Sequence, residues 1–139
     1  LSNFACLAEI PGVTFYALQK GTASLEALNP PEGMRIFNLE RELKDFSDTA
    51  AVIANLDLVV SVDTAVIHLA GAMGKPVWTL LPFAPDWRWL LEREESPWYP
   101  SMRLFRQTHH EDWEGVMERV RQALTEEVFG RGLLDNSFV

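Results

Sequence analysis

The sequence of 139 residues has one cysteine, no long apolar segment and no excess of basic residues. Cys6 cannot form a disulfide within the chain, which favours a reducing compartment such as the cytoplasm. The longest apolar run, residues 56–62, includes Asp57 and is far shorter than the roughly 18 residues of a membrane span. The formal net charge of −8 predicts no broad surface for nucleic acid or anionic membranes.

The remaining composition is that of a folded protein, with 47% hydrophobic and 23% charged residues. The length suits one domain with one core. We therefore expect a single domain over residues 1–129, followed by a C-terminal tail over residues 130–139.

Strand-like and helix-like segments alternate along the middle of the chain. The valine-rich run 56–62 is typical of a strand covered on both faces. Either Asp45 or Ser47 suits the N-cap of a helix through residues 50–54. This alternation predicts an α/β fold with a parallel sheet. The expected strands are 13–18, 34–38, 56–62, 76–81 and 102–105, and the clearest helices are 64–73 and 111–128.

A stretch without regular pattern follows the predicted strand at 76–81. Residues 82–100 hold three of the five tryptophans and read as a loop. These tryptophans either line a ligand cleft or cover the edge of the sheet.

The junction between strand 56–62 and helix 64–73 is the strongest local signal for a site. In open α/β sheets, ligands bind where strands end and helices begin, and free N–H groups of a first helical turn suit phosphate. His68 lies four residues after Thr64, so both share one helix face, near Asp63. The alternative is that Asp63 only caps the helix and His68 is a hydrogen-bonded core residue.

The same junction resembles the donor-site signature of family 9 glycosyltransferases, the heptosyltransferase-like enzymes. The signature covers residues 59–70, VVSVDTAVIHLA. A bacterial subgroup, in which this domain often follows tetratricopeptide repeats, is similar over most of the chain. Its further motifs occur here in order as DFSDTAA (45–51), GKPVW (74–78), DWRW (86–89), SPWYP (96–100) and RLFRQ (103–107).

The resemblance implies the C-terminal, nucleotide-sugar-binding half of a GT-B fold, with a Rossmann-like parallel sheet flanked by helices. It assigns donor-sugar hydroxyls to Asp63 and the diphosphate to the N–H groups of Thr64 and Ala65. The family motif has glycine at the position of Ala65, so the chain departs from it there. His68 joins this group as a donor-binding candidate.

Six further residues are weaker candidates for donor binding. Those at the end of strand 13–18 suit ribose or phosphate, although they also suit a solvated turn. The pair before the helix at 50–54 suits the nucleotide base, although Phe46 also suits hydrophobic packing at the helix start. The pair in the loop follows a strand end and suits the cleft. These candidates are Gln19, Lys20, Lys44, Phe46, Asp86 and Arg88.

A metal site is not expected. His109 and His110 are adjacent, so their side chains point apart on an extended segment, and no cysteine lies near them to complete a ligand set. The resemblance likewise implies that helix N-termini and basic side chains hold the diphosphate without a metal.

The resemblance also implies parts that precede Leu1: an N-terminal acceptor domain with the catalytic base, and the first strand of this sheet. We therefore expect a fragment that does not catalyse turnover by itself. The alternative is a non-catalytic nucleotide-binding or protein-interaction module appended to tetratricopeptide repeats. Without that first strand, the remaining strands either pair directly or recruit a second copy, and we favour a homodimer.

Overall fold

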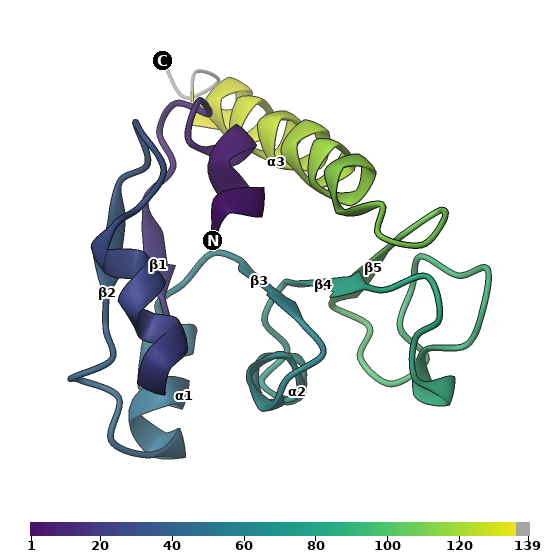
Figure 1. Ribbon diagram of the computed structural model, residues 1–139, viewed down its shortest axis with the longest axis horizontal. Coiled ribbons are helices and arrows are strands. Elements are labelled where there is room, and N and C mark those ends of the chain that lie inside the picture. Colours follow the sequence, from purple (N-terminus) through teal and green to yellow (C-terminus); the bar gives the residue numbers. More distant parts are fainter. Residues whose placement is uncertain (136–139) are drawn as a thin grey trace. The chain divides into compact units, whose positions relative to one another are not determined.

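The computed structural model describes residues 1–135, and the side chains of residues 1–130. The sequence predicts one domain over residues 1–129. In the structure the chain forms two compact units, which are described separately. The first comprises Leu1–Glu42 and the chain from Met117 onward, and the second comprises Leu43–Val116 (Figure 1).

The first unit contains a small parallel sheet. Strand β1 pairs with β2, and Phe15 lies opposite Ile36. Glu40 fastens the connection between the strands, because it accepts hydrogen bonds from the Gly21 N–H at 2.8 Å and from the hydroxyl of the buried Ser24. The elements of this unit are the 3₁₀ helices η1 (Ser2–Leu7) and η2 (Gly21–Leu28), strands β1 (Phe15–Ala17) and β2 (Ile36–Asn38), and most of helix α3 (Trp113–Asp135).

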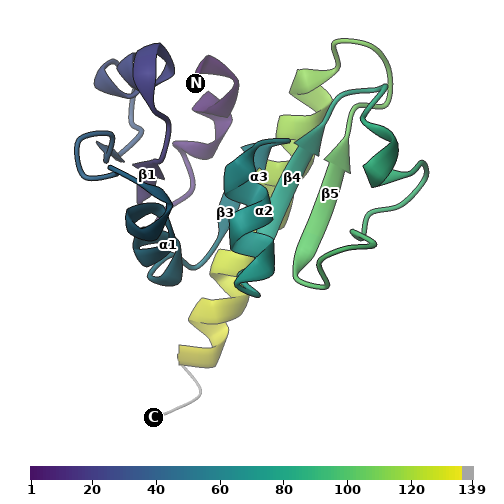
Figure 2. The same ribbon diagram turned by 90° about the horizontal axis from the view of Figure 1, so that it is seen from below.

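The second unit contains a three-stranded parallel sheet in the order β3-β4-β5. Helix α2 packs against β3 and β4 (Figure 2). Parallel sheets with flanking helices confirm the predicted α/β, Rossmann-like fold. The elements are helices α1 (Phe46–Ala54) and α2 (Ala65–Ala72), strands β3 (Val59–Val62), β4 (Val77–Leu81) and β5 (Met102–Arg106), and the 3₁₀ turn η3 (Trp87–Trp89).

Strand β4 is the buried centre of this sheet, and all five of its residues are buried. Strand β3 is shorter than the valine-rich run suggests. Of its four residues only Val59 is buried, and Val62 is 45% exposed. The expected covering on both faces therefore applies to β4, whereas β3 is a partly covered edge strand.

The strands do not join into one sheet. Among the described residues, β1 pairs only with β2, and β3 pairs only with β4. The Val59 N–H bonds to the Pro76 carbonyl at 3.0 Å. Since alternate residues of a strand point to opposite sides, the peptide groups of Val60 and Val62 point away from β4. Direct closure by pairing the remaining strands did not occur.

Helix α3 extends further than its sequence pattern predicts. It continues through Gly130 to Asp135, beyond the expected end at residue 128. Residues 136–139, the rest of the predicted tail, lie outside the described residues. In residues 1–135, no helix has the length and apolar character to cross a membrane.

Asp45 is the N-cap of α1, which settles the choice between Asp45 and Ser47. The Asp45 carboxylate accepts the Asp48 N–H at 3.0 Å, and the Asp48 carboxylate accepts the Lys44 N–H at 2.9 Å. The first bond satisfies an N–H group that α1 itself leaves without a partner, and the second fixes the chain just before the helix.

We predict that Asp45→Ala lowers the free energy of unfolding by about 1 kcal/mol, because it removes an N-cap acceptor. Ser47→Ala is the matched control and should change stability by less than about 0.5 kcal/mol, since Ser47 is exposed inside the helix. Urea unfolding monitored by circular dichroism measures both. Equal effects of the two changes would contradict the assignment of the cap.

Candidate functional site

The site is built where β3 ends and α2 begins. Asp63 follows the last residue of β3, and Thr64 is the N-cap of α2. The Thr64 side chain makes no capping hydrogen bond, and both Asp63 carboxylate oxygens have other partners. The Asp63 carboxylate is therefore not a helix cap, and the first backbone N–H groups of α2 have no side-chain partner from the cap position.

The Asp63 carboxylate instead receives donors from two other parts of the second unit. Oδ1 lies 3.3 Å from Nε2 of His68, and Oδ2 accepts the indole N–H of Trp89 at 2.8 Å. The Arg88 guanidinium lies 3.8 Å from Oδ2. The side chain remains 27% exposed, so the carboxylate is held by the protein and still reaches solvent.

His68 connects Asp63 to Tyr99. Its Nδ1 lies 3.2 Å from the Tyr99 hydroxyl, and its ring stacks on Trp89 with centroids 5.6 Å apart. Because a carboxylate oxygen only accepts, Nε2 is the donor in the contact with Asp63, and Nδ1 pairs with the Tyr99 hydroxyl. The imidazole is 33% exposed, so His68 is fully hydrogen-bonded without being a core residue.

Trp89 comes from the tryptophan-rich segment, Pro82–Pro100, and is fully buried. Arg106 donates to the Trp89 carbonyl. Trp98 donates its indole N–H to the Arg88 carbonyl at 2.9 Å, and Ser96 accepts the N–H groups of Trp98 and Tyr99. The predicted loop is thus a hydrogen-bonded structure in which Trp89 covers the site, while Trp87 and Trp98 are 75% and 56% exposed.

Asp86 and Arg88 form an ion pair beside Asp63. The Asp86 carboxylate accepts the Arg88 backbone N–H at 3.0 Å and its Nε–H at 2.9 Å. The backbone bond is the main reason that the pKa of Asp86 lies below its usual range, and the Arg88 side chain adds to it. Arg88 therefore lies between two carboxylates and is 46% exposed.

The other four predicted residues lie on other elements of the chain. Lys44 and Phe46 are at the start of α1, and Phe46 is 65% exposed. Gln19 and Lys20 follow β1 in the first unit, where Lys20 is the N-cap of η2. Their roles in ligand binding stay predictions.

Within residues 1–135, no group of three or more His, Cys, Asp or Glu side chains is arranged to hold a metal ion. The paired histidines contact different partners. His109 Nδ1 lies 3.8 Å from the Asp112 carboxylate, and the His110 ring lies 4.8 Å from that of Phe83.

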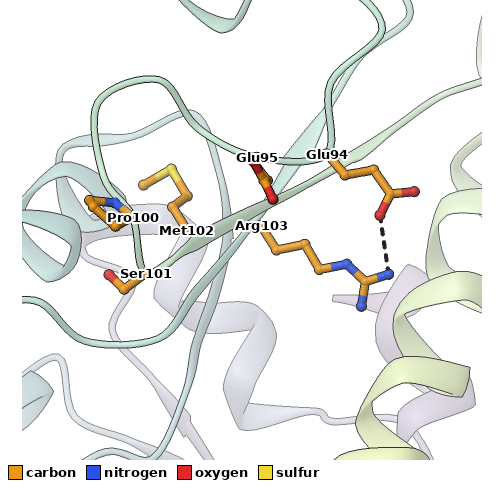
Figure 3. A pocket seen from close by; sticks show the side chains of 6 residues that line it. All are labelled: Glu94, Glu95, Pro100, Ser101, Met102 and Arg103. Carbon is orange, nitrogen blue, oxygen red and sulfur yellow. Dashed lines mark hydrogen bonds and ion pairs between the residues drawn. The ribbon is translucent and has the colours of Figure 1, made fainter.

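A shallow pocket of about 310 Å³ opens elsewhere in the second unit (Figure 3). An ion pair between Glu94 and Arg103, 3.4 Å apart, lies along it. The pocket adjoins the first residues of β5, whereas Asp63 follows the last residue of β3. Because the strands are parallel, the pocket lies at the amino ends of the strands and Asp63 lies at their carboxyl ends. Its lining residues are Glu94, Glu95, Pro100, Ser101, Met102 and Arg103.

A family model and a curated relative match this chain. The sequence model of glycosyltransferase family 9 (heptosyltransferase) matches residues 17–111, which is more than half of the chain. The chain belongs to glycosyltransferase family 9. It is 42% identical over 118 residues to Protein FlbA of Caulobacter vibrioides, an alignment that covers 82% of this chain and 20% of FlbA.

The family 9 chain thus spans about a fifth of the length of that curated relative. No solved structure gives a significant match. The matched region includes the β3–α2 junction and the tryptophan-rich segment, so the family assignment rests on the part of the chain that forms the Asp63 cluster.

Two members of the cluster, Trp89 and Tyr99, were not predicted as site residues. They lie 26 and 31 residues along the chain from their hydrogen-bond partners. Trp89 lies in the motif DWRW and Tyr99 lies in SPWYP. The order of these motifs was the available sequence signal for the two residues.

Tyr99 fits against α2 because residue 71 on that helix is glycine. A Cβ atom at Gly71 would lie 2.6 Å from the Tyr99 ring. Glycine therefore allows the phenol to approach the helix closely and reach His68.

We predict that Gly71→Ala lowers stability by about 1–3 kcal/mol, because the added methyl group overpacks the contact with Tyr99. Gly130→Ala is the matched control. Nothing lies within 4 Å of a Cβ there, so the better helix propensity of alanine should raise stability by up to about 1 kcal/mol. Chemical unfolding measures the change in the free energy of unfolding, which should have opposite signs in the two variants. A Gly71→Ala variant as stable as wild type would contradict the close approach of Tyr99 to α2.

Proposed function

We propose that this chain is the donor-binding domain of a glycosyltransferase and binds a nucleotide-diphosphate sugar at the Asp63 cluster. The observation that carries the proposal is the Asp63 carboxylate. It stands at the carboxyl end of a parallel strand, is held from two sides, and remains partly exposed. Ligands of open α/β sheets bind at this edge.

The chemistry of the cluster suggests which part of the donor lies where. A carboxylate attracts hydroxyl donors and repels phosphate, so Asp63 suits the hydroxyls of the sugar. The diphosphate suits the N–H groups of Thr64 and Ala65 at the start of α2, where the Thr64 side chain does not cap the helix and the helix dipole favours an anion. Arg88 adds a partly exposed positive charge beside Asp63.

The remaining candidates complete this proposal. Gln19 and Lys20 are assigned to the ribose or a phosphate, and Lys44 and Phe46 to the nucleotide base. Asp86 supports the proposal indirectly, because it orients Arg88. The donor is a substrate, and we expect neither a metal nor another cofactor.

We propose further that this chain binds the donor without turnover by itself. The GT-B resemblance assigns the acceptor site and the catalytic base to an N-terminal domain of the parent protein. The chain corresponds to a fifth of the length of FlbA, which leaves room for such a domain in a protein of that size. The single cysteine favours the cytoplasm as the compartment.

A second candidate function is a non-catalytic nucleotide-binding or protein-interaction module appended to tetratricopeptide repeats. The exposed Trp87, Leu91 and Trp98 favour it, since exposed apolar side chains mark interaction surfaces. A thermal-shift screen with UDP-, GDP-, ADP- and CMP-sugars separates binding of a sugar nucleotide from protein interaction alone. The parent sequence then separates enzyme from module, since a second Rossmann-like half with a base facing the cleft supports the enzyme.

We predict weak binding of a nucleotide-diphosphate sugar that Asp63→Ala and Lys20→Ala each reduce. Loss of a charge-assisted hydrogen bond costs about 1.5–3 kcal/mol, which is roughly a ten- to hundredfold loss of affinity. Asp57→Ala is the control, because it removes a carboxylate from the opposite end of β3. Titration calorimetry with equal affinity for wild type and Asp63→Ala would remove Asp63 from the site.

We also propose that the chain forms a homodimer. The peptide groups of Val60 and Val62 point away from β4, and an edge of this kind pairs readily with another chain. The exposed side chains of the tryptophan-rich segment offer a second apolar surface in the same unit. A symmetric contact between two copies covers either surface.

Light scattering during gel filtration should therefore give the mass of a dimer. Val60→Pro removes an N–H that does not bond to β4 and should give a monomer if the strand edge is the interface. Leu91→Asp should do so if the tryptophan-rich segment is the interface, since Leu91 is 72% exposed. A monomeric wild-type chain at high concentration would contradict the dimer.

A further inference from the structure

We propose that Trp89 is a positioning residue that fixes the Asp63 carboxylate for recognition of the donor sugar. This inference rests on the proposed function. Trp89 is fully buried, and its indole N–H is the one polar group of its side chain. That group donates to Oδ2 of Asp63 at 2.8 Å, the shortest of the three polar contacts of this carboxylate given above.

The backbone around Trp89 is held from several directions. Asp86 caps the turn η3 through the Arg88 N–H, and Arg106 donates to the Trp89 carbonyl. Leu90 follows with φ 53°, a conformation that L-residues other than Asn and Asp rarely adopt. Such a conformation persists only where surrounding contacts enforce it. The indole is thus presented to Asp63 by a fixed backbone.

Trp89 and His68 together determine the orientation of the carboxylate. Each takes one oxygen, so rotation about the Cβ–Cγ bond of Asp63 would break both hydrogen bonds. An ionised carboxylate has about four lone-pair positions, which leaves about two for other donors. Adjacent hydroxyls of a sugar match two acceptor positions held in fixed directions, and prior orientation of this kind raises affinity.

Arg88 and Trp89 act on Asp63 from the same turn with different consequences. The guanidinium is 46% exposed and 3.8 Å away, so it supplies charge without fixing direction. The indole has no charge, and its hydrogen bond fixes the orientation of the carboxylate. A loss of the indole N–H should therefore affect the sugar, which meets the carboxylate, far more than the diphosphate.

The test compares Trp89→Phe with Trp87→Phe. Trp89→Phe keeps an aromatic ring against His68 and removes the donor, whereas Trp87 is 75% exposed two residues away. Calorimetry uses UDP-glucose, GDP-mannose and ADP-glucose, each beside its free nucleoside diphosphate. We expect Trp89→Phe to weaken binding of the sugar nucleotide about tenfold and of the nucleoside diphosphate less than twofold. Trp87→Phe should change neither.

A second variant separates hydrogen bonding from packing. Replacement of Trp89 by β-(3-benzothienyl)alanine keeps the bicyclic shape and lacks the N–H, so it should reproduce the selective loss even if the smaller phenyl ring disturbs the fold. In ¹⁵N-labelled protein the chain gives five indole signals. The signal that Trp89→Phe deletes should be the one that Asp63→Asn shifts most.

Three outcomes would overturn the inference. Unchanged sugar-nucleotide affinity in both Trp89 variants would mean that the hydrogen bond does not matter for binding. Equal loss of sugar nucleotide and nucleoside diphosphate would mean that Trp89 has a structural role only. If wild type binds none of the three sugar nucleotides, the proposed function fails and this inference with it, whereas the indole spectra still report the Trp89–Asp63 contact.

Discussion

The hydrogen bond between the Trp89 indole and the Asp63 carboxylate is the interaction on which the rest of the site depends. A buried indole N–H needs an acceptor, and an isolated carboxylate near the protein interior needs donors. Each group satisfies the other, and in doing so they fasten the tryptophan-rich segment to the β3–α2 junction. His68 and Tyr99 extend the same network from the opposite side of the carboxylate.

Because Asp63 is engaged in this network, the start of α2 differs from the start of α1. In α1 the carboxylate of the cap residue Asp45 accepts the backbone N–H of Asp48, so a side chain caps the helix. In α2 the cap residue is Thr64, whose side chain makes no capping bond, and the neighbouring carboxylate is engaged elsewhere. Two helices of one unit thus begin in chemically different ways: a side chain caps α1 from the N-cap position, and none does so in α2.

Much of the fold could be predicted because its signals are local. The junction after Val62 follows from residues within one turn of it, and so does the pair of cap candidates Asp45 and Ser47, between which the structure decides. The end of α3 could not be predicted in this way. Gly130 resembles a helix stop, although its helix cost of about 1 kcal/mol is small enough to be offset by the rest of a long helix. The 3₁₀ helix η2 lacks a regular apolar pattern and was missed for that reason.

The site was predictable in part, for a related reason. Asp63 immediately precedes the N-cap of α2 and His68 lies in the first turns of that helix, so the local geometry of the junction brings them together. Asp86 and Arg88 were predicted from their place after a strand. Trp89 and Tyr99 depend on how an irregular segment folds back over α2, and no periodicity within that segment encodes this return. The sequence did not indicate which tryptophan of the segment is buried.

The contact between Gly71 and Tyr99 has a consequence for the history of this family. A phenol ring occupies the space that a side chain on α2 would need, so a change at one of the two positions alters the cost of a change at the other. A larger residue at 71 is expected to be tolerated best beside a smaller one at 99, which would remove the hydroxyl that contacts His68. Substitutions at these two positions should accordingly appear together in descendants, which would make the pair a recognisable mark of lineages that keep this network.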